Sequence, residues 1–242
     1  MRLSTGLSLA LALVFLAGPA LAQEMTLDFG GEGQSLSLRS VQLLLLITVL
    51  SIVPGLAVMV TCFPFIVTVL SILRQALGLQ QAPPNMLIIS LALFLTWYVM
   101  DPVFTEAWVK GIEPMTNGQI EVGPGLQAAI APFRVFMAAR VDPETLQTLQ
   151  DLRSTATITA TDAPLSLLVP SFLLSEIQRA FEIGFMIFLP FLIIDLVVAA
   201  ILMSMGMMMV PPAIVSLPFK LVFFVVADGW ALISGALVRS YF

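Results

Sequence analysis

Long apolar segments dominate the chain, and prolines and glycines interrupt them at irregular intervals. The segment 41–73 carries no charge, and Pro54-Gly55 divides it. A proline removes one helix hydrogen bond, so this pattern predicts two helical pieces joined by a bend. The segment 85–100 predicts another helix of about 24 Å, short of a hydrocarbon core of about 30 Å. We therefore expect a first hydrophobic helical hairpin at 41–100 that does not fully cross a bilayer.

Polar residues become frequent between residues 101 and 164, where the chain has eight acidic and four basic side chains. This pattern predicts a water-exposed helical insert. Within it we expect a helix interrupted at Pro132 and another that begins at Asp142-Pro143, because aspartate is a good N-cap and proline suits the first helical position. The chain is apolar again over 165–242, which predicts a second hydrophobic hairpin whose two halves meet at a methionine-rich loop, 203–212.

The first 22 residues have the layout of a cleavable signal peptide. Arg2 precedes a short apolar run, and small residues lead to a cleavage site between Ala22 and Gln23. An uncleaved first helix is the alternative, although the apolar run is shorter than the roughly 20 residues that span a bilayer. Cleavage would leave a polar N-terminal segment, 23–40, outside the cytoplasm. The hairpin would return the insert to that side, and its acidic excess suits a periplasmic location.

Composition identifies a membrane protein rather than a soluble enzyme. Hydrophobic residues make up 59% of the chain and charged residues 10%, and the mean hydropathy is +1.04. There is no histidine and only one cysteine, Cys62, so we expect no metal site and no cofactor. The net charge of −5 without a basic patch argues against nucleic acid as a partner. Asp195 and Asp228 lack the glycine-flanked pattern of intramembrane aspartyl proteases, and we expect no enzyme activity.

The apolar blocks of the second hairpin contain six notable charged residues: Glu176, Arg179, Glu182, Asp195, Lys220 and Asp228. Charges at membrane depth are costly, so they usually face a bundle interior, a partner subunit or water. The first three follow at helical spacing and can pair along the helix. A proton or substrate path is one interpretation, and ion pairs that fix helix register or subunit contacts are the one we favour. In particular, Lys220 is expected to pair with Glu176 or Glu182, within or between subunits.

Five methionines occupy seven positions at the junction of the two halves: Met203, Met205, Met207, Met208 and Met209. Gly206 interrupts them, and Pro211 and Pro212 follow, so a helix cannot continue and a loop is predicted. The segment 204–215 has no charge, which is unusual for a free cytoplasmic turn. We expect this loop to lie against protein or to line a cavity, because irregular backbone at membrane depth survives only there.

Four stretches together resemble one family: RQALGLQQAPPN, LALFLTWYVMDPV, SEIQRAFEIGFMIFLPFLIIDLVVAAILMSMGMMMVPP and SLPFKLVFFVVADGW. They are similar to the FliP family of the bacterial type III export apparatus, over about residues 41–110 and 165–240. The chain departs from the family at Pro64-Phe65, where a threonine-arginine pair is common, and at Met86, where glutamine is common. Some pieces are closer to the virulence injectisome branch, but the methionine loop and the signal peptide favour the flagellar branch.

The resemblance implies an all-α integral membrane protein that assembles into a helical homo-oligomeric channel, a pentamer, in the inner membrane at the flagellar basal body. FliQ-like and FliR-like membrane proteins would be its partners, with other membrane proteins of the export apparatus, and unfolded flagellar subunits would pass through it. In this family the loop that matches Met207, Met208 and Met209 forms a gasket at the narrow part of the channel. An injectisome homologue and, from other classes, a secondary transporter or a purely structural membrane scaffold remain as alternatives.

Overall fold

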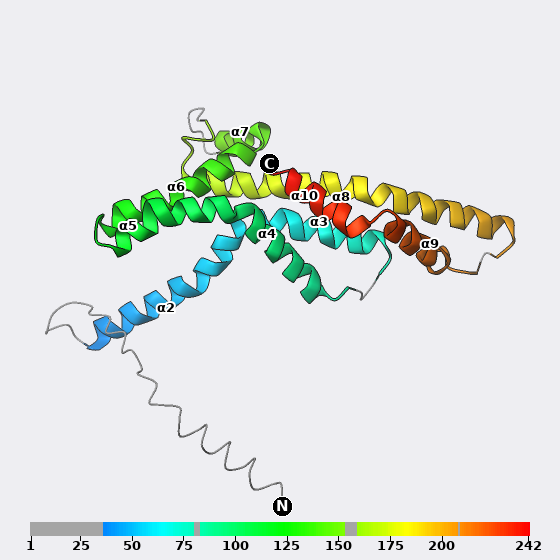
Figure 1. Cartoon of the computed structure of the whole chain (residues 1–242), viewed down its shortest axis with the longest axis horizontal. Helices are drawn as coiled ribbons and strands as arrows, with labels where there is room; N and C mark the ends of the chain where they lie inside the picture. Colours follow the sequence, from blue (N-terminus) through cyan, green and yellow to red (C-terminus); the bar gives the residue numbers. More distant parts are fainter. Residues whose placement is uncertain (1–35, 80–82, 153–158, 208) are drawn as a thin grey trace, which may run out of the picture. The chain divides into compact units, whose positions relative to one another are not determined.

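The computed structural model describes residues 36–79, 83–152, 159–207 and 209–242. The predicted signal peptide, the cleavage site at Ala22 and Gln23, most of the segment 23–40 and Met208 lie outside the described residues. Within the described residues the chain is helical and contains no strand, which confirms the all-α prediction (Figure 1). The elements are α2 (Leu36–Met59), α3 (Phe63–Ala76), α4 (Asn85–Ala107), the π-helical turn η1 (Trp108–Ile112), α5 (Glu113–Thr116), α6 (Val122–Arg140), α7 (Pro143–Leu152), α8 (Leu165–Ser204), α9 (Pro212–Val226) and α10 (Gly229–Arg239).

The chain divides into two units, residues 1–50 and 51–242, and α2 contains the boundary. The bend predicted at Pro54-Gly55 is wrong, because α2 continues through Pro54 to Met59. A single proline removes one hydrogen bond, and long apolar helices tolerate that loss. The break lies instead at residues 60–62. There the Thr61 hydroxyl donates to the Val58 carbonyl at 2.7 Å and accepts the Phe63 amide at 3.3 Å.

The helix that begins at Asn85 does not end at residue 100. α4 continues through Asp101 and Pro102, and η1 and α5 extend it to Thr116 as one apolar stretch of 32 residues. The predicted short helix and its boundary with the insert are therefore wrong. Packing explains the extension, since α3 contacts α4, and α6 contacts both α4 and η1. At Gly111 a Cβ atom would lie 2.4 Å from the Ala129 amide nitrogen, so only glycine fits this close approach.

The two helices expected in the middle of the chain are present, with one difference. α6 runs without interruption through Pro132, which the sequence had predicted as a break. α7 begins at Pro143 as predicted, and the Asp142 carboxylate accepts the Thr145 amide at 2.9 Å, which confirms the predicted N-cap.

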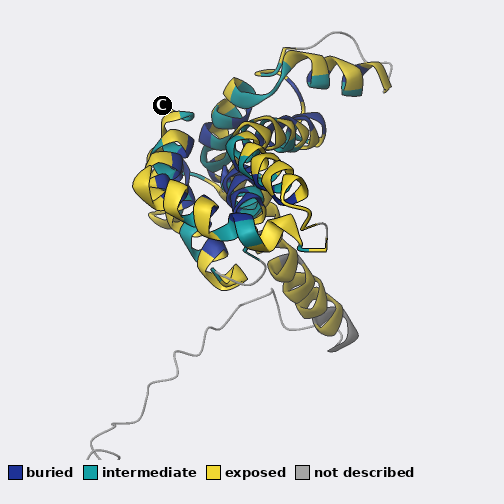
Figure 2. Ribbon diagram, turned by 90° about the vertical axis from the view of Figure 1, so that its right-hand side faces the viewer, coloured by how far each residue is buried: buried dark blue, intermediate teal, exposed yellow. Residues whose placement is uncertain are grey.

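The core of the second unit lies between α3 and α8. Figure 2 shows buried residues gathered where helices meet, whereas the outward faces are exposed. α3 is short, but its inward face is fully buried and consists of large apolar residues: Phe65, Ile66, Val69, Leu70 and Leu73. A smaller cluster around Met137, Leu168 and Phe172 joins α6 to the first part of α8. The burial of one apolar face of each helix is what fixes this arrangement.

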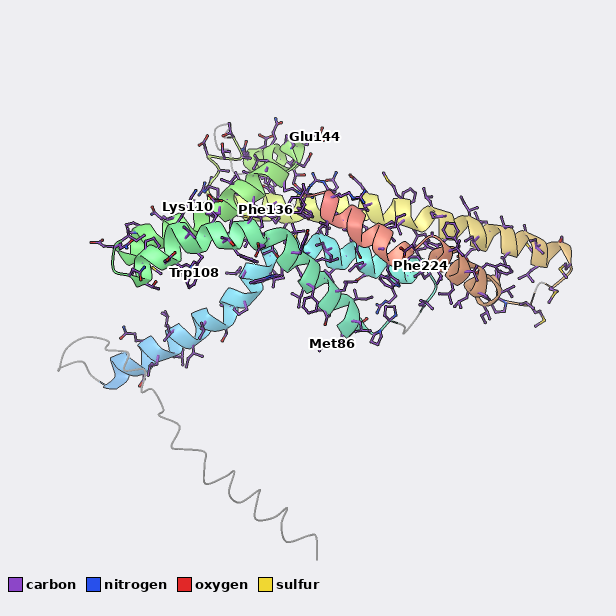
Figure 3. All side chains as sticks on the ribbon, viewed as in Figure 1. Met86, Trp108, Lys110, Phe136, Glu144 and Phe224 are labelled. Carbon is purple, nitrogen blue, oxygen red and sulfur yellow. The ribbon has the colours of Figure 1, made fainter. Side chains whose placement is uncertain are left out.

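Among the residues that the structure describes, three helical stretches are long and apolar enough to cross a membrane, judged by length and composition, and a bent pair would be a fourth. That pair is α9 and α10, which meet at an angle of 62°. Asp228 sits at the break with a left-handed φ of 50°. Phe224, labelled in Figure 3, packs edge-on against Trp230 at 5.4 Å between ring centroids and fills the inside of the bend. The last apolar block is therefore two helices rather than one.

Candidate functional site

The methionine loop, residues 203–212, has a helix end of defined geometry. The Met207 amide donates to the Leu202 carbonyl at 2.9 Å, and the Gly206 amide donates to the Met203 carbonyl at 3.1 Å. These two bonds form a Schellman motif, which satisfies carbonyls that the end of α8 would otherwise leave open. Gly206 has a φ of +75°, a conformation that side chains disfavour. Gly206 therefore ends α8 in a conformation that favours glycine.

The other end of the loop depends on the two prolines. Pro211 is the N-cap residue of α9 with extended backbone, and Pro212 is its first helical residue. Proline is well suited there because its missing amide needs no partner in the first turn. The Val210 amide donates to the Met207 carbonyl at 3.3 Å within the loop. Both ends of the loop are therefore fixed by backbone geometry.

The four methionine side chains of the loop that the structure describes are exposed. The exposed fractions are 60% for Met203, 66% for Met205, 42% for Met207 and 97% for Met209. Packing within the chain therefore does not explain the cluster. Met205 and Met207 also line an apolar groove of about 480 Å³ between α8 and α9. The chain presents flexible apolar side chains at one end of its longest helix.

Behind the loop, Lys220 joins three helices. Its ammonium group donates to the Asp195 carboxylate on α8 at 2.6 Å and to the Ala76 carbonyl at the end of α3 at 3.1 Å. Ser216 donates to the other Asp195 oxygen at 2.5 Å. Only 4% of Lys220 is exposed. Within the described chain, the predicted pairing of Lys220 with Glu176 or Glu182 is wrong.

Ala76 is the last residue of α3, so its carbonyl is a favourable acceptor for the Lys220 ammonium group. The last four carbonyls of a helix have no partner within the helix and carry a partial negative charge. Lys220 donates hydrogen bonds both to one of these carbonyls, that of Ala76, and to the Asp195 carboxylate. Asp195 lies on α8, which packs against α9, and this tertiary contact decides the pairing.

Glu176 is the second buried charge and has three donors. Arg140 reaches it at 3.0 Å and Arg179 at 3.2 Å, and the Tyr241 hydroxyl donates to its other oxygen. The pair three residues apart, Glu176 with Arg179, confirms the expected pairing along the helix. Arg140 also lies 4.0 Å from the centre of the Tyr241 ring. Sequence reasoning missed Arg140 and Tyr241, because they come from α6 and the C-terminus and no local spacing relates them to Glu176.

Two of the six charges are exposed in the described chain. Glu182 is exposed and accepts from the Gln178 amide at 3.2 Å. Asp228 is exposed at the break between α9 and α10. Neither lies inside the helix bundle of the single chain, so of the three expected surroundings only water or a partner subunit applies to them. Roles for them in assembly stay predictions.

Three ionisable side chains outside the candidate membrane spans have pKa values that differ from the ordinary ones. Bonds from the Thr145 amide and hydroxyl lower the pKa of Asp142. Burial raises the pKa of Tyr241, and the Glu176 carboxylate adds to that effect. Burial also raises the pKa of Cys62 to about 12, against the opposing effect of the nearby Thr96 hydroxyl. The Cys62 thiol therefore stays protonated and unreactive at neutral pH. Across the described residues, no cluster of His, Cys, Asp or Glu could hold a metal ion.

The comparison with known families decides between the possible classes. Residues 46–237 match the FliP family. The chain belongs to the FliP family. A "Flagellar biosynthetic protein FliP" from Caulobacter vibrioides is 48% identical over 96% of this chain and 88% of its own length. Proteins of the same name from Agrobacterium fabrum and Bacillus subtilis are 50% and 45% identical, over 81% and 84% of this chain and 81% and 92% of their own lengths.

FliP family membership confirms the resemblance seen in the sequence. The match spans the methionine loop, the Lys220 network and, of the Glu176 network, Arg140, Glu176 and Arg179 but not Tyr241. It also spans Pro64, which lies in the first turn of α3.

Proposed function

We propose that this FliP family member is a core subunit of the flagellar type III export gate. Copies of the chain, with FliQ-like and FliR-like membrane proteins, would form the channel through which unfolded flagellar subunits cross the inner membrane. The relatives are flagellar biosynthetic proteins by name, which supports the flagellar setting. The observation that carries the channel role is the exposed methionine loop between α8 and α9.

The length of α8 supports assembly with other protein chains. Its 40 residues measure about 60 Å, twice the hydrocarbon thickness of about 30 Å. Apolar side chains are nevertheless exposed along much of it, including Phe185, Leu196 and Ile201. A bilayer can cover only about half of such a helix, so protein must cover the rest. Copies of the same chain, packed side by side, would supply that cover.

Methionine suits the narrow part of a channel that passes many sequences. Its unbranched thioether can repack around any passing segment. When the channel is idle, a ring of apolar side chains excludes water and ions by dewetting. The Schellman motif and the prolines fix the two ends of the loop, and the described methionine side chains between them are exposed. A gasket requires this combination of fixed ends and exposed side chains.

The contacts of Lys220 with Asp195 and Ala76 would fix the position of the methionine loop relative to α3 and α8. They fasten α9 to α8 by the Asp195 carboxylate and to α3 by the Ala76 carbonyl. The loop is the connection between α8 and α9, so its two ends are tied to one buried cation. We infer that this network serves assembly rather than a proton path.

A leak assay tests the gasket. Replacement of Met207, Met208 and Met209 by alanine should leave assembly intact and make membranes permeable to a small dye or to ions. The matched control is Met86→Ala, because Met86 is 74% exposed but lies on α4, far along the chain from the loop (Figure 3). If the triple variant assembles and its membranes remain impermeable to the dye and to ions, the gasket role is refuted.

Native mass spectrometry tests the subunit role. The chain should purify from cells that also make the FliQ-like and FliR-like proteins as a homo-oligomer that carries both, and the same spectrum should show cleavage after Ala22. A monomer or dimer that ignores these partners would overturn the proposal and favour the transporter alternative.

A further inference from the structure

The methionines of the chain differ in how far water can reach them. Met100 and Met137 are buried, with 0% and 1% exposed. Other exposed methionines of the described chain lie within candidate membrane spans: Met59, Met86, Met186 and Met203. Met205, Met207 and Met209 are exposed and lie between α8 and α9, outside the candidate spans. These three therefore have the sulfur atoms that a polar solute reaches most easily.

A thioether in contact with water is open to oxidation. A lone pair of the methionine sulfur attacks one oxygen of hydrogen peroxide, the O–O bond breaks, and the other oxygen leaves as water. The sulfur loses two electrons and becomes a sulfoxide, and the peroxide is reduced by the same two electrons. The reaction needs no catalytic group, so access to the sulfur decides which methionine reacts.

The backbone of the methionine loop does not depend on its sulfur atoms. The Gly206 and Met207 amides bond to backbone carbonyls of α8, and the Val210 amide bonds to the Met207 carbonyl. Pro211 and Pro212 begin α9 through their own ring geometry. Oxidation should therefore leave the course of the loop unchanged and alter only the polarity of its side chains.

The surroundings of the loop are apolar, which makes that change of polarity large. The segment 204–215 carries no charge. Met205 and Met207 line the groove between α8 and α9 with apolar residues alone, among them Ile201 and Phe219. A sulfoxide oxygen beside these residues would need water as its hydrogen-bond partner, because an unpaired polar group in apolar surroundings is costly. Water is what a dewetted constriction excludes.

We propose that Met205, Met207 and Met209 form an oxidation site, at which a peroxide converts the thioethers to sulfoxides and so opens the idle channel to water and ions. The oxidation itself depends only on the exposed side chains. The opening rests on the proposed function, because it requires that the methionine loop is the gasket.

The test uses vesicles that contain the chain assembled with the FliQ-like and FliR-like proteins and that enclose a small dye. Dye efflux is measured before and after hydrogen peroxide, which catalase then removes, and peptide mass spectrometry locates the added oxygen. Met205, Met207 and Met209 should react at least about tenfold faster than Met100 and Met137. Dye efflux from the wild type should rise at least about tenfold, a change of about 1.4 kcal/mol in the barrier.

Two variants address the loop itself. Leucine has about the volume of methionine and no sulfur, so it suits replacement of all five loop methionines. In that variant the ratio of efflux after peroxide to efflux before it should be about one. The matched control is Met86→Leu with Met186→Leu, which should keep the wild-type ratio. Met209→Gln adds a polar side chain without an oxidant and should raise efflux at least about threefold before peroxide.

Failure of the oxidation site and failure of the gasket give different results. Unmodified Met205, Met207 and Met209 in the wild type, or oxidation of Met100 at the same rate, would overturn the oxidation site alone. An oxidised loop in vesicles that retain the dye would overturn the opening. The gasket would then stand if the triple alanine variant leaks and would be refuted if that variant also retains the dye. A wild-type ratio in the leucine variant would place the leak elsewhere and overturn the proposal.

Discussion

Removal of the Lys220 ammonium group should destabilise the chain strongly, because it leaves a carboxylate and a helix-end carbonyl without their cation. Lys220→Met keeps the length of the side chain and removes the charge. Loss of one partner from a fully buried pair costs about 3–5 kcal/mol. The Asp195 side chain is 30% exposed, and water can solvate it in part. We therefore expect a cost of about 2–3 kcal/mol, below the range for a fully buried pair.

The double variant Lys220→Met/Asp195→Leu removes both members of the ion pair, so it leaves no buried charge without a partner. Ser216 keeps a partner there, since its hydroxyl also lies 3.2 Å from the Ala213 carbonyl. Replacement of a buried pair by apolar residues of similar size is often close to neutral. We expect the double variant to lie within about 1 kcal/mol of the wild type, so the two single effects should not add.

The chain provides its own reporter for this measurement. Cys62 is its one cysteine and is fully buried. A thiol-reactive fluorogenic dye should therefore react only on unfolding, and a temperature ramp in detergent gives the midpoint. At about 2–4 °C per kcal/mol, Lys220→Met should lower the midpoint by about 4–12 °C.

Lys110→Met is the matched control, because Lys110 pairs with Glu106 on the surface, with 63% and 46% of the two side chains exposed. Exposed pairs contribute about 0–1 kcal/mol, so this midpoint should fall by no more than about 4 °C. Single effects that add in the double variant, or a Lys220→Met midpoint no lower than that of Lys110→Met, would refute the assigned network.

Other packing and charge effects follow from the same structure. Gly111→Ala should lower the midpoint by about 2–12 °C, because its Cβ would meet the Ala129 backbone and overpacking costs about 1–3 kcal/mol. Tyr241→Phe should cost about 1–3 kcal/mol in the same assay, since it leaves one oxygen of the buried Glu176 without its donor. The carboxylate of Asp142 should stabilise the start of α7 fully above the ordinary pKa of 3.8, and this stabilisation should disappear as the pH falls through the lowered pKa of the folded state. Hydrogen exchange of the first turn of α7 between pH 7 and pH 3 should measure that loss, after correction for intrinsic exchange rates.

Controls separate these effects from general damage. Gly55→Ala should be neutral or stabilising, because nothing lies within 4 Å of its Cβ position and alanine favours a helix. Asp142→Asn should flatten the pH dependence while it keeps a capping oxygen. An unchanged midpoint in Gly111→Ala, or an unchanged pH profile in Asp142→Asn, would contradict the corresponding contact.

Local chemistry in the sequence determined the helical class, the ends of the methionine loop and the start of α7. Apolar segments of this length predict helices in lipid whatever surrounds them. Glycine and proline act through their own backbone preferences, so Gly206, Pro211 and Pro212 could be assigned without tertiary structure. The same reasoning predicted helix breaks at Pro54 and Pro132, but α2 and α6 continue through these prolines.

Only the tertiary structure decided which charges meet and where helices end. Lys220 pairs with Asp195 because α8 and α9 pack together, and Glu176 meets Arg140 and Tyr241 because α6 and the C-terminus converge on it. The sequence separation of these residues follows no helical spacing that would predict the ion pairs. The extension of α4 beyond residue 100 likewise depends on contacts with α6. Burial and pairing are properties of surfaces brought together, so residue order alone could identify these charges as significant but could not identify their partners.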